Sequence, residues 1–76
     1  MVTVFGVEKN SIAERAGLFP GDILISIDGH EIADVLDYRF YLFEREIELL
    51  VHRGPDLLSF RIHKPEYDDI GLSFDT

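Results

Sequence analysis

Cysteine and tryptophan are both absent from this sequence. Without a thiol the chain forms no disulfide, no thiolate metal site, no Cys-held iron–sulfur cluster and no cysteine nucleophile. Long hydrophobic runs are also missing: no segment approaches the ~20 apolar residues that cross a bilayer, and the first residues show neither the basic region nor the apolar stretch of a secretion signal. We therefore expect a soluble, unprocessed chain in the cytoplasm.

Positive charge is scarce as well. Seven Lys and Arg stand against 15 Asp and Glu, which gives a net charge of -8. A surface this acidic repels phosphate backbones and anionic lipid heads, so neither nucleic acid nor a membrane is an expected partner. With 76 residues, 46% of them hydrophobic, and no linker or repeat, the chain is expected to fold as a single domain over residues 1–76 and to be monomeric.

Hydrophobic periodicity predicts an α+β fold of five to six strands with one short and one longer helix. Apolar residues at every second position predict strands near residues 2–7, 23–27, 30–32, 46–51, 58–62 and 70–74. In the second of these, Ile23, Ile25 and Ile27 are the predicted buried face. The last strand is short and lies near the chain end, so we expect it at a sheet edge.

Capping residues mark both helices. Ser11 and Glu14 have the spacing of a capping box, in which each side chain bonds the other residue's amide, and Gly17 is placed to end that helix after two turns at most. Asp34 is the expected N-cap of the second helix, predicted over residues 34–43.

The second helix is unusually aromatic. Leu36, Phe40 and Phe43 form one stripe at helical spacing, which is more often core than ligand groove. The aromatic residues still exceed what so small a core absorbs, so some of them are expected to face a groove or a partner, with Tyr38 and Tyr41 at its rim.

Residues 7–29 read VEKNSIAERAGLFPGDILISIDG. This string resembles the signature of bacterial PDZ domains, with the following residues in matching positions: Ser11, Ala13, Ala16, Gly17, Leu18, Pro20, Gly21, Asp22, Leu24, Ile27 and Gly29. The resemblance covers nearly the whole chain and implies a PDZ-like, partly open β-barrel or sandwich. PDZ domains bind an extended peptide as an added strand between a sheet edge and a helix, and a loop of backbone amides holds the peptide's carboxylate.

The amide loop of the family is similar to Asp69-Ile70-Gly71-Leu72 here, which stands near the end of the chain and so implies a circularly permuted order. The peptide-binding residues implied by the resemblance are Ile70, Gly71, Leu72, Ser73, Phe74, Leu36, Phe40, Phe43 and Lys64. Asp68 and Asp69 are expected to repel an incoming carboxylate, with Lys64 as the one nearby cation that offsets them. Substituting Gly71 by Val is expected to block binding while leaving the fold largely intact.

The pattern that ends in Tyr67-Asp68-Asp69-Ile70-Gly71-Leu72 also resembles the N-terminal PDZ-like region of larger bacterial proteins related to radical-SAM iron–sulfur enzymes. That resemblance implies that the chain is the N-terminal fragment of a larger protein. Two functions therefore stay open: a module that binds a separate peptide or protein, and a docking or regulatory domain that contacts its own downstream enzyme and meets no free peptide. Self-association through the exposed sheet edge is a third alternative.

Catalysis and metal binding are not expected in this segment. His30, His52 and His63 fall in different predicted elements, and the hydroxyl of Ser11 is explained by capping. One loop does offer hard metal ligands, namely His63, Glu66, Asp68 and Asp69, but their spacing matches no calcium or zinc pattern, and a solvated acidic loop is the better interpretation. We expect no catalytic residue, no metal and no cofactor.

Overall fold

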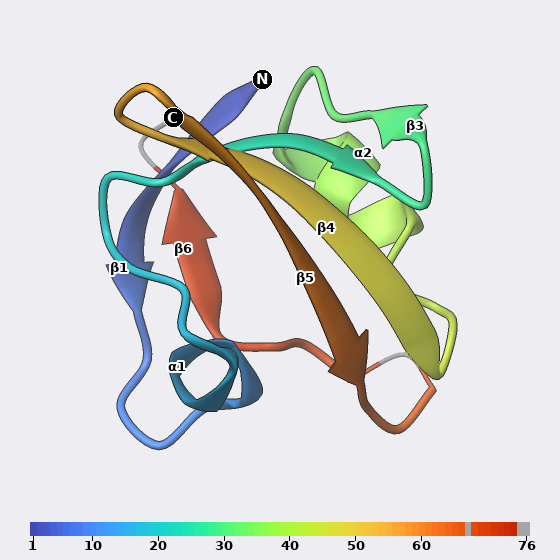
Figure 1. Cartoon of the computed structure of the whole chain (residues 1–76). Helices are drawn as coiled ribbons and strands as arrows, with labels where there is room; N and C mark the ends of the chain where they lie inside the picture. The colour runs from blue at the N-terminus through green and yellow to red at the C-terminus, as the bar shows by residue number, and fades with distance from the viewer. Residues whose placement is uncertain (67, 75–76) are drawn as a thin grey trace.

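Six strands form one antiparallel sheet, and two short helices pack at its margins (Figure 1). The structure is a computed structural model that describes residues 1–66 and 68–74. The elements follow the chain in this order: β1 (Val2–Val7), α1 (Ile12–Ala16), β2 (Ile23–Ile27), β3 (His30–Glu31), α2 (Val35–Phe40), β4 (Glu46–Arg53), β5 (Asp56–His63) and β6 (Leu72–Phe74). The strand order in space is β5-β4-β2-β1-β6, and β3 pairs with β2. The predicted PDZ-like α+β fold is confirmed.

Helix α1 begins at its predicted cap. The Ser11 hydroxyl accepts a hydrogen bond from the Glu14 amide at 3.1 Å, as expected of a capping residue. The second half of the predicted capping box is wrong, because the Glu14 carboxylate accepts from the Asn10 amide at 2.8 Å and not from that of Ser11. Gly17 ends the helix in the left-handed conformation, and the amide of the buried Leu18 closes the last turn on the Ala13 carbonyl.

Strand β2 does not bury the face that its alternation predicts. Leu24 and Ile27 are fully buried, whereas Ile23 and Ile25 are only half-buried. The reason is a register shift between Leu24 and Ser26 in the pairing with β4. One extra residue in a strand reverses the side-chain alternation beyond it, so the period-two pattern fails at this point.

The two hairpins follow their turn sequences. Asp28 and Gly29, both at positive φ, connect β2 to β3, as an Asp-Gly pair favours. Gly54-Pro55 connects β4 to β5, which pair from Glu46↔His63 to Arg53↔Asp56. Strand β4 keeps its predicted alternation and contributes Ile47, Leu49 and Val51 to the core. Its neighbour β5 directs Leu58, Phe60 and Ile62 toward the same core.

Helix α2 begins at the predicted cap but is shorter than predicted. The Asp34 carboxylate accepts from the amides of Leu36 and Asp37, and the helix ends at Phe40 instead of continuing to residue 43. With six residues against five in α1, it is barely the longer of the two. The chain leaves the helix at Tyr41 and carries Leu42 into the core.

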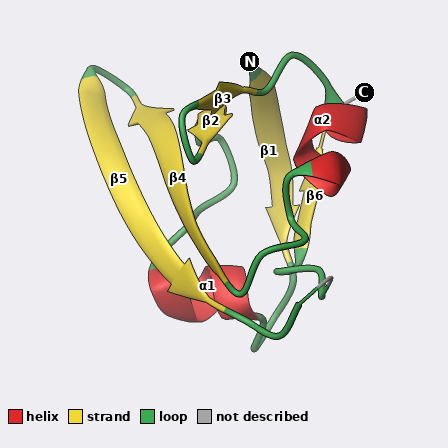
Figure 2. Cartoon of the chain, turned by 90° about the vertical axis from the view of Figure 1, so that its right-hand side faces the viewer, coloured by secondary structure: helices red, strands yellow, loops and turns green. Residues whose placement is uncertain are grey.

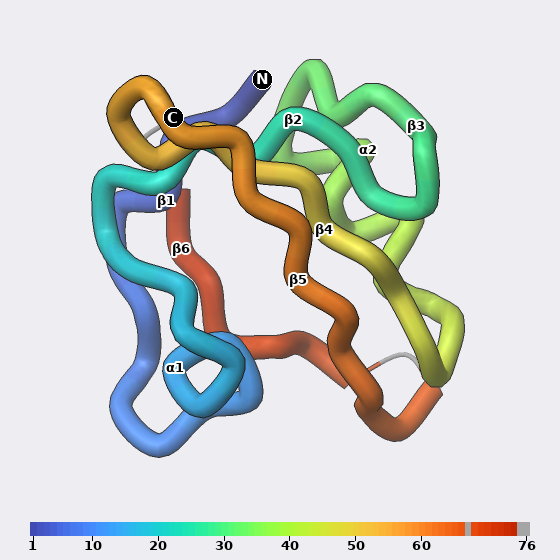
Figure 3. Tube along the Cα trace, in the orientation of Figure 1, coloured from blue at the N-terminus to red at the C-terminus, as the bar shows by residue number. Residues whose placement is uncertain are grey.

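The C-terminal segment is the outer edge that the sequence predicts, but its strand is shorter. Strand β6 begins at Leu72, while Ile70, predicted to lie within it, is buried in the loop before it. Figure 3 shows the part of this loop after residue 67 running past α1 to β6. Of the motif that begins at Tyr67, that tyrosine itself falls outside the described residues.

An ion pair joins two distant parts of the fold. Asp22, 1% exposed, accepts hydrogen bonds from the Arg53 guanidinium at both carboxylate oxygens, each at 2.8 Å, and from the Phe19 amide at 2.9 Å. The Arg53 guanidinium also donates to the Gly17 carbonyl at 2.8 Å and stacks over the Phe19 ring. One guanidinium therefore holds the end of α1 and the start of β2 against the β4–β5 turn.

None of the helices in the described part of the chain has the length and apolar character needed to cross a membrane.

Candidate functional site

Strand β6 and helix α2 face each other across a shallow hollow of about 260 Å³. Both elements stand on the same side of the molecule in Figure 2. The strand pairs on one side with β1, and within the described residues it is the end of the sheet path. The hollow is lined by Val35, Tyr38, Arg39, Asp69, Leu72, Ser73 and Phe74. An edge strand beside a helix is the geometry in which an extended peptide can be added to a sheet.

Tyr38 forms the base of this hollow. Its ring is 2% exposed and meets the Phe74 ring edge to face, with 4.6 Å between ring centroids. This position corrects the sequence interpretation, which placed Tyr38 at a wet rim. Because Val35, Tyr38 and Arg39 are three and four residues apart, they share one face of α2, and that face is turned toward β6.

The Tyr38 hydroxyl links the helix to the loop before β6. It donates a hydrogen bond to Asp69 Oδ1 at 2.8 Å. Burial raises the pKa of Tyr38, and the charge and hydrogen bond of Asp69 raise it further, so the hydroxyl keeps its proton. The backbone amides of Leu72 and Ile70 oppose this rise.

In the loop predicted to hold a carboxylate, the Gly71 amide is bonded within the loop itself. The Gly71 amide donates to Asp69 Oδ1 at 2.9 Å, so the same oxygen accepts from Gly71 and from Tyr38. The carbonyls of this loop are bonded as well: Gly71 accepts from the Glu8 amide, and Ile70 accepts from the Ala13 amide in the first turn of α1, both at 2.8 Å. The loop is thus fixed on both of its hydrogen-bonding sides.

Gly71 adopts a φ of +96°, and a Cβ atom there would lie 2.4 Å from the Ser11 Cβ. The expectation that Gly71→Val leaves the fold largely intact is therefore wrong, because the side chain would strike the residue that caps α1. Gly71 is needed for the fold itself, independently of any ligand.

The predicted groove residues divide between two places. Leu72, Ser73 and Phe74 line the hollow, Gly71 lies directly before them, and Ile70 is buried beneath. The helical stripe lies elsewhere. Leu36 is 74% exposed and Phe40 66% exposed, about 100° around the helix from the wall that faces β6.

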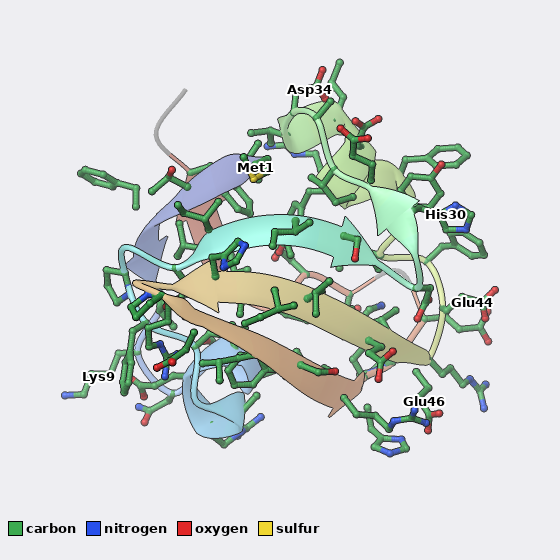
Figure 4. The ribbon with its side chains drawn as sticks, turned by 45° about the horizontal axis from the view of Figure 1, so that its top comes forward. Met1, Lys9, His30, Asp34, Glu44 and Glu46 are labelled. Carbon is green, nitrogen blue, oxygen red and sulfur yellow. The ribbon has the colours of Figure 1, made fainter. Side chains whose placement is uncertain are left out.

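The aromatic side chains gather around a second hollow, of about 390 Å³, beside the β2–β3 turn. It is lined by Asp28, His30, Phe40, Tyr41, Phe43, Glu44 and Glu46. The His30 ring stacks on that of Tyr41 with 4.3 Å between centroids, and Figure 4 shows His30, Glu44 and Glu46 at one end of the molecule. The sequence stripe therefore marks an exposed aromatic patch, separate from the hollow beside β6.

Lys64, the predicted cation of the amide loop, is 5% exposed and donates from Nζ to the Pro65 carbonyl. Burial lowers the pKa of Lys64, while the charges of Asp68, Glu66, Asp69 and Glu44 oppose that change. Lys64 does not line the hollow between α2 and β6. Its ammonium group is therefore buried and bonded to the chain's own backbone.

Sequence reasoning missed Val35 and Arg39 as groove residues. The capping residue could have indicated them. With Asp34 as N-cap, Val35 is the first helical residue, and the residues three and four positions on, Tyr38 and Arg39, share its face of the helix. Choosing that face over the adjacent stripe requires knowing which side of α2 meets the sheet. Within residues 1–66 and 68–74 there is no group of three or more His, Asp or Glu arranged to hold a metal ion.

A family model described as the PDZ domain matches residues 3–53, which is more than half of the chain. The matched segment runs from β1 through the end of β4 and so includes both helices. Strand β5, the amide loop and β6 lie beyond it.

Proposed function

This chain belongs to the PDZ domain family, whose members are typically non-enzymatic modules that bind a peptide or protein, and we propose that it binds an extended segment as an added strand beside β6. The observation that carries the proposal is the hollow between the edge strand β6 and the Val35–Tyr38–Arg39 face of α2. A strand laid there gains main-chain hydrogen bonds from β6 and side-chain contacts from the helix.

The opposite edge of the sheet is less suited to strand addition. Strand β5 is eight residues long and carries Arg61 and His63, both of which pair with Glu46 on β4. Charged side chains along an edge strand discourage pairing with another chain. Helix α1 contacts β5, but the hollow described above between a helix and an edge strand lies beside β6.

We expect Val35→Glu to weaken peptide binding about tenfold, because a carboxylate replaces an apolar contact worth roughly 1.4 kcal/mol at the groove wall. The helix should tolerate the change, since an acidic residue in the first turn interacts favourably with the helix dipole. Binding is followed by titrating ¹⁵N-labelled protein with a pool of capped hexapeptides rich in β-branched residues. The matched control is Leu36→Ser, one position along on the exposed stripe, which should leave affinity unchanged.

In the same titration, wild-type amide shifts should concentrate at residues 71–74 and 35–39. Shifts confined to β5 would move the binding edge to the other side of the sheet and contradict the proposal. Equal affinities of wild type and Val35→Glu would show that the α2 wall takes no part.

A second candidate function is docking on another protein through the exposed apolar stripe of Leu36, Phe40 and Phe43. The observation that favours it is that these three large apolar side chains are 74%, 66% and 39% exposed, and that Phe40 and Phe43 line the second hollow together with Glu44 and Glu46. This candidate corresponds to a docking or regulatory domain of a larger enzyme. Loss of partner binding in Phe40→Ser with retained peptide binding would separate it from the groove.

The order of the elements and the relation to larger proteins are also proposals. We propose that the order of elements is a circular permutation of the usual PDZ order, with the amide loop moved to the C-terminal side of the domain. The relation to radical-SAM iron–sulfur proteins, the absence of a cofactor in this segment, the single domain over residues 1–76 and the monomeric state stay predictions.

A further inference from the structure

The amide loop before β6 already holds a carboxylate, and it is the chain's own. Asp69 Oδ1 accepts the Gly71 amide at 2.9 Å and the Tyr38 hydroxyl at 2.8 Å. The Gly71 amide, which a loop of this kind could offer to an incoming carboxylate, is thus already bonded to a side chain of the domain itself.

An approaching C-terminal carboxylate would meet an acceptor at this point. Asp69 is exposed and also lines the neighbouring hollow formed with Gly6, Val7, Glu8 and residues 71–73, and among the described residues of that lining the two charged ones, Glu8 and Asp69, are both acidic. Two carboxylates a few ångströms apart repel by about 1 kcal/mol in water and by more where water is partly excluded. A group with N–H donors, in contrast, can bond the Asp69 oxygens without displacing them.

We propose that Asp69 is the specificity-determining residue of the groove: it occupies the carboxylate position and makes the groove select a segment that continues as peptide over one that ends in a free carboxylate. This inference rests on the proposed function, since it assumes that a strand is added beside β6. A continuing chain presents a backbone amide where a free C-terminus presents an anion, and a carboxamide-ended peptide mimics the continuing chain.

The anchoring of Asp69 distinguishes it from the neighbouring acid. Asp68 carries the same charge one residue earlier, and its amide donates to the Pro65 carbonyl, but the bonds to Gly71 and Tyr38 belong to Asp69. If general acidity of the loop rejects a carboxylate, both aspartates contribute. If occupation of the Gly71 amide rejects it, only Asp69 does.

The experiment compares two versions of one hexapeptide pool, N-acetylated and β-branched-rich, prepared with free carboxylates and as carboxamides. Each is titrated into wild type, Asp69→Ala and Asp68→Ala, with Kd taken from the amide shifts of residues 71–74 and the fold checked by circular dichroism. We expect wild type to prefer the carboxamide pool. Asp69→Ala should raise affinity for the free-acid pool about tenfold and reverse the preference, whereas Asp68→Ala should change the ratio by less than about threefold.

The outcomes distinguish a failure of this inference from a failure of the proposed strand addition beside β6. A wild-type preference for free carboxylates overturns the inference, and so does an unchanged ratio in Asp69→Ala or an equal change in both variants. In those cases both pools still shift β6, and the groove stands. Absence of shifts at β6 and α2 with both pools in all three proteins overturns the groove and the inference together.

Discussion

Gly71→Ala should lower the midpoint of thermal unfolding by about 15 °C, which corresponds to roughly 2–4 kcal/mol for a domain of this size. Two causes add. The residue has a φ of +96°, where a side chain is strained, and its new Cβ would approach the Ser11 Cβ to 2.4 Å. Neither partner can move aside, because Ser11 caps α1 and the loop is tied through the Gly71 and Ile70 carbonyls to Glu8 and Ala13.

Gly21→Ala is the matched control for this substitution. Gly21 has a φ of +95°, almost the same as Gly71, but no atom lies within 4 Å of a Cβ built there. It should therefore lose only the conformational part, about 1 kcal/mol or roughly 5 °C. Differential scanning calorimetry on the three proteins gives the steric part as the difference between the two variants. Equal losses would mean that the contact with Ser11 relaxes freely.

Local signals in the sequence predicted the elements that depend on near neighbours. Ser11, Asp34 and the Asp28-Gly29 pair each act within four residues, and each stands where expected as a cap or a turn. The alternation of β4 also held, because that strand is paired on both sides in the interior of the sheet. The glycine and proline framework of residues 7–29 was enough to indicate the family, which the match over residues 3–53 shows.

The sequence predictions that proved wrong concern which face of an element is buried, because that depends on distant parts of the fold. The buried face of β2 depends on the bulge in its pairing with β4, and no residue pattern within β2 indicates that bulge. The face of α2 that meets β6 is another case: the stripe of Leu36 and Phe40 is the more apolar, but Tyr38 fills the core and turns that stripe outward.

The role of Asp69 was predicted only in part. Repulsion of a carboxylate could be expected from the charge of Asp69 alone, but the bond of its side chain to the Gly71 amide depends on how the loop folds. The second anchor, Tyr38, is 31 residues away. A contact across that separation is set by the packing of α2 on β6 and has no local pattern to reveal it.

Asp22→Ala should destabilise the domain by about 2–3 kcal/mol, because it removes a buried carboxylate that accepts three hydrogen bonds and leaves the Phe19 amide unpaired. Total stability of a 76-residue domain is on the order of 4–11 kcal/mol, so the loss is a large fraction. Chemical denaturation at pH 7 measures it. Glu46→Gln, at a pair whose side chains are about half exposed or more, is the control and should change little.

The pH dependence of this pair has a definite sign. Hydrogen bonds from Arg53 lower the pKa of the Asp22 carboxyl; burial opposes them, and the Phe19 amide adds to the lowering. A carboxyl whose pKa is lowered by folding contributes stability above its unfolded pKa, ~3.9, and loses it as the pH falls toward the folded value. The stability difference between wild type and Asp22→Asn, which retains an acceptor for Phe19 but no charge, should therefore be constant from pH 7 to pH 5 and shrink below pH 4. A difference that stays constant down to pH 2, or that widens on acidification, would show that Asp22 stabilises the fold without its charge.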